Sequence, residues 1–189
     1  MTKYKWLYMK AVFLIIPMLY GCSTPPAPQD RIILPEAVLS ELNKFKVRHW
    51  KYIIIHHSGS YKGSASTMDR YHREERGWKN GLGYHFVIGN GKGARNGLIE
   101  VGGRWNGQMK GAHAGSDEYN QYGIGICLVG NFDVNRPTRA QISALVDLIK
   151  YLQECCNIPR RRILVHKSLK ITKCPGKYFP YSEVMSRLR

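Results

Sequence analysis

The sequence predicts an α/β fold: a single domain with a central mixed β-sheet flanked by helices and a groove at the strand ends. Three observations indicate this class. Short β-branched apolar runs alternate with stretches of helical periodicity, so strands are interleaved with helices. The 189 residues suit one ordinary domain, and 43% of them are hydrophobic, so the chain can bury a core.

Five apolar segments are predicted as strands, at 52–55, 84–88, 98–101, 124–129 and 163–165. The first has the sequence Tyr-Ile-Ile-Ile and is followed by two histidines, a serine and a glycine, so it ends in a loop near His56. Asn90 and Gly91 supply a turn between the second and third strands. The fifth strand ends directly at His166.

Three segments are predicted as helices. Ser66 and Asp69 have the spacing of a capping box, and a short charged helix follows them and stops at Gly77. Thr138 and Gln141 form a second capping box, in front of the strongest amphipathic pattern of the chain. Its apolar positions are Ile142, Leu145, Val146, Ile149 and Leu152. Residues 181–188 are predicted as a closing helix.

The first 21 residues have the features of a lipoprotein-type signal peptide. Lys3, Lys5 and Lys10 precede the apolar run 11–19, which is too short to span a bilayer as a helix. The segment Leu-Tyr-Gly-Cys that ends at Cys22 resembles a bacterial lipoprotein box, which implies a lipid on Cys22. We therefore expect an exported bacterial lipoprotein of the cell envelope, anchored to a membrane and facing the periplasm or the outer membrane.

The next residues are rich in proline and small side chains. Residues 22–34 are predicted as the lipidated cysteine and a semi-extended tether. No internal repeat and no second shift in composition follows, so residues 35–189 are assigned to one domain.

Histidines at two strand ends form a candidate metal site with a cysteine. His56 and His166 each stand where an apolar strand gives way to a loop, and Cys174 follows eight residues after His166. Two imidazoles and a thiolate suit Zn²⁺, and three protein ligands leave the fourth tetrahedral position for water. Taken one at a time, a histidine at a strand end is usually just hydrogen-bonded, and a buried cysteine usually acts as a small apolar residue.

A series of short motifs in order resembles one family. The motifs are His56-His-Ser, Tyr71-His-Arg-Glu-Glu-Arg-Gly-Trp, Gly83-Tyr-His-Phe, Gly111-Ala-His-Ala, Tyr119-Asn, Gly123-Ile-Gly-Ile-Cys-Leu-Val-Gly and Lys173-Cys-Pro-Gly. Together they are similar to the zinc-dependent N-acetylmuramoyl-L-alanine amidases, which include phage lysozyme-type amidases and peptidoglycan recognition proteins. The similarity covers about residues 50–180.

The resemblance implies a fold, a cofactor and site residues. It implies an α/β domain with one Zn²⁺ in a groove at the strand ends, and peptidoglycan or muropeptides as partners. The implied zinc ligands are His56, His166 and Cys174, and Tyr84 matches the tyrosine that assists hydrolysis. Thr172 is expected to support the developing oxyanion. The substrate-binding candidates are His57, His113 and Asn120. Because the non-catalytic recognition proteins lack the cysteine ligand, the presence of Cys174 favours an active hydrolase.

The sequence is also compatible with other functions. Cys174 and His166 would also suit a cysteine peptidase, with Cys174 as the nucleophile. A peptidoglycan-binding lipoprotein without catalytic activity is a further alternative. The 29 basic against 13 acidic residues, a net charge of +16, predict an anionic neighbourhood. Nucleic acid is not expected, since no recognition helix or RNA-binding signature accompanies the charge. We expect a monomer, and Cys127, Cys155 and Cys156 are given no functional role.

Overall fold

The computed structural model describes residues 33–188 and confirms the predicted fold class. The strands are β1 (Tyr52–His57), β2 (Phe86–Ile88), β3 (Ile99–Val101), β4 (Gly123–Leu128) and β5 (Ile163–Val165). They form one sheet in the order β3-β2-β4-β1-β5. Of the strand pairs within residues 33–188, only β2–β3 is antiparallel. The predicted signal peptide, Cys22 and nearly all of the tether lie outside the described residues.

Six α-helices accompany the sheet in the described part of the chain. They are α1 (Glu36–Leu42), α2 (Ala65–Glu74), α3 (Gly103–Asn106), α4 (Asp117–Tyr122), α5 (Arg139–Cys156) and α6 (Tyr181–Ser186). Two 3₁₀ turns, η1 (Arg160–Arg162) and η2 (His166–Ser168), flank β5. No helix within residues 33–188 is both long and apolar enough to cross a bilayer.

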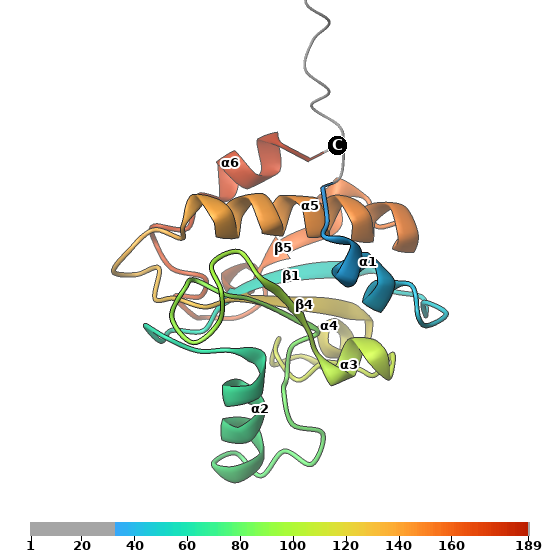
Figure 1. Ribbon diagram of the computed structural model, residues 1–189, viewed down its shortest axis with the longest axis horizontal. Helices are drawn as coiled ribbons and strands as arrows, with labels where there is room; N and C mark the ends of the chain where they lie inside the picture. Colours follow the sequence, from blue (N-terminus) through green and yellow to red (C-terminus); the bar gives the residue numbers. More distant parts are fainter. Residues whose placement is uncertain (1–32, 189) are drawn as a thin grey trace, which may run out of the picture. The chain divides into compact units, whose positions relative to one another are not determined.

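The two faces of the sheet have different neighbours. Helix α5 lies along one face, with α1 and α6 on the same side, and α2 lies on the other (Figure 1). Because side chains alternate along a strand, Ile53 and Ile55 of β1 enter the larger core, which also contains Leu145 and Ile149 of α5. His56, at the next position, belongs to the opposite face.

Helix α5 begins as its sequence predicts. The Thr138 hydroxyl accepts a hydrogen bond from the Gln141 backbone N–H, and the Gln141 side chain accepts one from Thr138. The Gln141 amide also donates to the carbonyls of Ile88 and Val129, so it joins the helix to the strands beside it. The helix ends at Cys156, and the capping residue Asn157 adopts the left-handed conformation in which asparagine is favoured.

The capping box predicted for α2 is wrong by two residues. Ser64 and Thr67 make the reciprocal cap, so the helix begins at Ala65. Asp69 instead accepts hydrogen bonds from Arg73 and from the backbone of Leu82, which tie the helix to the segment in front of β2.

Strand β2 is shorter than predicted. It begins at Phe86, and Tyr84 precedes it. The His85 backbone still bonds Gly125 of β4 and Gly102, whereas the Gly83 carbonyl accepts a hydrogen bond from the backbone of Ala112, in the loop before α4. Tyr84 is thereby held at the edge of the sheet, beside that loop.

Candidate metal centre

The carboxyl ends of β1, β2, β4 and β5 lie at the same edge of the sheet, because these strands are parallel. His56 stands near the end of β1, and His166 is the residue after β5. Cys174 lies in the loop that follows η2. One ligand atom from each residue can be chosen so that all three lie within 4.8 Å of one another. The structure therefore brings together the three predicted metal ligands from segments 118 residues apart.

His56 is held by a chain of hydrogen bonds that fixes its tautomer. Its Nε2 lies 3.0 Å from Nδ1 of His113, and Nε2 of His113 lies 3.3 Å from the Gly123 carbonyl. A carbonyl only accepts, so His113 donates from Nε2 and accepts at Nδ1. His56 must then donate from Nε2, which leaves its Nδ1 without a proton. This nitrogen faces the Cys174 Sγ at 3.8 Å.

His166 also offers a free nitrogen. Its Nε2 is buried and has no hydrogen-bond partner within the described residues, although a buried polar atom is normally paired. The Ala114 carbonyl hydrogen-bonds the same ring, which accounts for the other nitrogen. The ring centroids of His56 and His166 are 4.5 Å apart. An unpaired nitrogen aimed at this cluster is the atom that a metal ion would satisfy.

Cys174 completes the ligand set. Its Sγ accepts a hydrogen bond from the His57 backbone at 3.4 Å, and burial raises the pKa of its thiol to about 11. Burial, and then the neighbouring imidazoles of His113 and His166, hold the pKa of His56 well below its ordinary value. Two neutral imidazoles and a thiol that can be deprotonated by a cation fit Zn²⁺.

Tyr84 borders both the ligand set and an open groove. Its ring centroid lies 5.2 Å from that of His56, and burial raises the pKa of its phenol well above the ordinary value. The phenol is therefore protonated at neutral pH and can donate a hydrogen bond. The groove beside it has a volume of about 400 Å³ and is lined on its far side by α2. Its lining residues include Ser58, Ser60, Lys62, Thr67, Tyr71 and His72.

The other predicted site residues surround the ligands. The Nδ1 of His57 accepts a hydrogen bond from the Phe132 backbone, and the ring is partly exposed. Thr172 is also partly exposed, and its hydroxyl oxygen accepts from the Cys174 backbone. The side chain of Asn120 accepts from the backbone of His113 and Ala114, so it shapes their loop.

His113 lies beneath His56 instead of on an open groove wall, since it is only 8% exposed. Two glycines make room for its ring. A Cβ atom at Gly125 would come within 2.5 Å of the ring, and one at Gly111 would come within 2.4 Å. Sequence reasoning missed this packing role. The signal was available in the alternating glycines of the β4 segment, since glycine inside a strand often marks a close approach by another group.

The fold and the site together define a class: an α/β domain whose parallel strand ends present a compact His–His–Cys set beside a groove. Residues 46–177 match the family model described as N-acetylmuramoyl-L-alanine amidase. The chain belongs to this family of peptidoglycan amidases, and the resemblance carried by its motifs is confirmed.

Relatives include both recognition proteins and amidases. A 135-residue stretch is 33% identical to peptidoglycan-recognition protein LB of Drosophila melanogaster and spans 66% of this chain and 54% of that protein. The N-acetylmuramoyl-L-alanine amidase of Sus scrofa is 30% identical over 112 residues, which are 58% of this chain and 17% of that protein. The match thus spans about half the length of the first relative and much less of the second.

Solved structures share the fold. The N-acetylmuramoyl-L-alanine amidase LysC from Clostridium intestinale URNW aligns with a TM-score of 0.64 at 31% identity, covering 75% of this chain and 87% of that one. Wild-type Drosophila PGRP-LB aligns with a TM-score of 0.57 at 30% identity, covering 76% and 87%.

Proposed function

We propose that this protein is a zinc-dependent amidase that hydrolyses the amide bond between N-acetylmuramic acid and L-alanine of the peptidoglycan stem peptide. The observation that carries the proposal is the ligand set: His56, His166 and Cys174 offer ligand atoms within 4.8 Å of one another, and the buried His166 Nε2 has no hydrogen-bond partner among residues 33–188. A zinc ion held there would polarise the scissile carbonyl and lower the pKa of water.

The residues around the ligands support this chemistry. The ring of Tyr84 lies beside His56, and its phenol is protonated and interacts with Cys127; on binding of substrate this phenol would donate a hydrogen bond to the developing oxyanion. The Thr172 oxygen already accepts from the Cys174 backbone, so its hydroxyl proton is available to a second acceptor. The groove next to Tyr84 offers room for a muramyl-peptide, and one solved relative, a PGRP-LB variant, is a complex with tracheal cytotoxin.

A cysteine peptidase is less well supported. A nucleophilic cysteine needs a lowered pKa, whereas burial raises the pKa of Cys174. A non-catalytic binding protein is the second candidate, because several relatives are named recognition proteins. It would retain muropeptides and release no stem peptide.

Products from intact sacculi test the proposal directly. We expect mass spectrometry to detect free stem peptides that begin with L-alanine, to show their loss with a chelator, and to show their return with Zn²⁺. Cys174→Ala should abolish both zinc retention and product. Binding of sacculi without any released peptide would instead establish the recognition function, and product that is insensitive to chelator would exclude the zinc mechanism.

We further propose export as a lipoprotein anchored through Cys22, as its sequence predicts. In a bacterial host, Cys22→Ser should move the protein from the membrane fraction to the soluble fraction and remove its acyl label. An unchanged distribution would contradict the anchor.

A further inference from the structure

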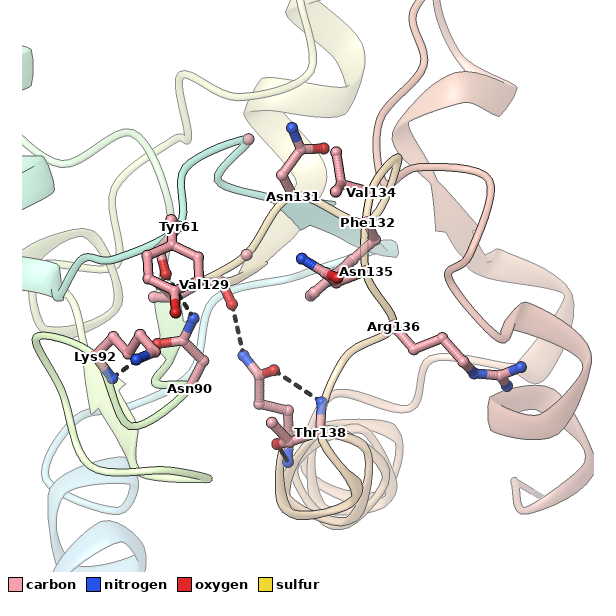
Figure 2. Close-up of a pocket in the computed structure, with 13 residues that line it drawn as sticks. Tyr61, Asn90, Lys92, Val129, Asn131, Phe132, Val134, Asn135, Arg136 and Thr138 are labelled. Atoms are coloured by element: carbon pink, nitrogen blue, oxygen red, sulfur yellow. Dashed lines mark hydrogen bonds between the residues drawn. The ribbon is translucent and has the colours of Figure 1, made fainter.

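A second cavity opens on the other side of the loop that borders the groove. It has a volume of about 510 Å³ and lies between the loops that follow β1, β2 and β4. Its lining includes Tyr61, Lys92, Val129, Phe132, Asn135 and Thr138. Figure 2 shows Tyr61 and Asn135 on opposite walls, with Val129 between them.

The loop 58–62 separates this cavity from the groove beside the ligands. Ser58, Ser60 and Lys62 line the groove, whereas Gly59 and Tyr61 line the second cavity. Because the loop is a shared wall, a ligand chain that fills the groove needs only to cross it to reach the second cavity.

Some of the polar side chains that line the cavity already make hydrogen bonds or ion pairs within the protein. The Gln141 amide is fully engaged by backbone groups, and the Asn90 amide bonds the Tyr61 carbonyl and the Lys92 backbone. Arg136 extends away from the cavity and reaches Glu183 at 3.7 Å (Figure 2). The Asn135 amide makes no hydrogen bond within the part of the chain that the structure describes, so it remains open to a ligand.

An aromatic ring and a cation stand at the mouth. Tyr61 is 66% exposed, and Lys92 Nζ lies 4.8 Å from the centroid of its ring. Among the described residues that line the cavity, none is acidic. An aromatic face attracts the C–H groups of a pyranose ring, an amide pairs with an acetamido group, and an ammonium group pairs with a carboxylate.

We infer that this cavity is an auxiliary subsite for an N-acetylated sugar unit of the peptidoglycan polymer, with Lys92 facing the carboxylates of a neighbouring stem peptide. The inference rests on the proposed function and refines its substrate class. Such a subsite makes polymeric peptidoglycan a better substrate than a single soluble muropeptide, because the polymer can occupy the groove and the cavity together.

Paired substitutions test the subsite. The variant carries Tyr61→Ala with Lys92→Gln, and the matched control carries Tyr178→Ala with Lys177→Gln. The control pair is also an exposed tyrosine with a lysine 4.8 Å from its ring centroid, but it lies outside the cavity. Both variants remove the same charge, so a general electrostatic attraction would weaken equally in both. Thermal melting of each full-length variant confirms that it is folded.

The first readout is the ratio of turnover on intact sacculi to turnover on a soluble monomeric muropeptide. We expect the cavity variant to lower this ratio roughly tenfold, the effect of truncating an aromatic anchor, and the control to change it by less than about twofold. An equal change in both variants, or no change in either, would overturn the subsite.

The second readout does not need hydrolysis. An oligomer of four N-acetylglucosamine units, followed by NMR, should shift the amide signals of residues 59–61 and 129–135 in the natural chain and not in the cavity variant. Shifts that persist in the variant, or that are absent from the natural chain, would refute the subsite. If sacculi and muropeptide are both left intact while these shifts occur, the proposed hydrolysis fails and the sugar site stands.

Discussion

His113 illustrates how one side chain outside the ligand set can orient a candidate metal ligand. Its Nδ1 accepts a hydrogen bond from Nε2 of His56 and its Nε2 donates one to the Gly123 carbonyl, so Nδ1 of His56 is left to face the ligand cluster. Groups that hydrogen-bond the outer nitrogen of a metal-binding histidine fix its orientation and its basicity. We therefore expect His113 to act as a positioning residue for His56.

Substituting His113 should weaken zinc binding. We expect His113→Ala to raise the zinc dissociation constant by about 10- to 100-fold, the usual cost of losing such a partner, in competition with a chromophoric chelator. His49→Ala is the control, since His49 is exposed. Equal zinc affinity in both variants would mean that His56 needs no support from His113.

Tyr84 should separate metal binding from catalysis. We expect Tyr84→Phe to retain one zinc ion by metal analysis and to lower kcat by about 10²- to 10³-fold, the usual effect of removing an oxyanion donor. Tyr71→Phe, in a residue of the same groove that is more than half exposed, should have little effect on kcat. A zinc-free Tyr84→Phe protein would show that the phenol is structural.

Strand β4 supports the site because Gly125 has no side chain. Gly125 faces the ring of His113, and any Cβ there would overlap it. We expect Gly125→Ala to lower the free energy of unfolding by about 1–3 kcal/mol, as overpacking does, and to weaken zinc binding as well. Urea unfolding measures the first effect.

Gly103→Ala is the matched control for this prediction. A Cβ at Gly103, at the start of α3, meets nothing within 4 Å, so its stability should change by less than about 0.5 kcal/mol. If Gly125→Ala is as stable as Gly103→Ala, the close packing of β4 on His113 is not required.

The elements also show what sequence reasoning can and cannot reach. The five strands and α5 were predictable because their apolar periodicity and the Thr138–Gln141 cap are local signals. Helix α1 and the short helices α3 and α4 were not predicted, because short helices depend on packing more than on propensity. The convergence of His56, His166 and Cys174 was predicted from strand ends and resemblance. The burial of His113 was not, because it depends on contacts across the sheet.

For the whole molecule, buried neutral histidines predict a loss of stability in mild acid. Burial holds the pKa of His85 well below its ordinary value and lowers that of His113 to about 3. The unfolded chain titrates near pH 6.5, so below that pH it binds protons that the folded chain does not. The free energy of unfolding should therefore decrease as the pH falls from 6.5 to 5.

The expected slope is about 1.4 kcal/mol per pH unit for each buried imidazole. Urea unfolding in a chelator, at pH values from 5 to 8, measures it. His85→Gln should reduce the slope by about 1.4 kcal/mol per pH unit, because it removes one buried imidazole. In the natural chain the His85 ring accepts a hydrogen bond from the Gly125 backbone and faces the Met109 carbonyl. A flat profile between pH 5 and 7 would show that these imidazoles titrate normally when folded.

The position of β1 in the sheet has a consequence for how the protein is made. Strand β1 is the first strand of the sheet to leave the ribosome, and it lies between β4 and β5. Both of these neighbours begin at least 66 residues after β1 ends. A nascent chain of 150 residues would carry His56 but neither His166 nor Cys174. Any capture of a metal by the full ligand set must therefore wait until Cys174 has been synthesised, after all five described strands.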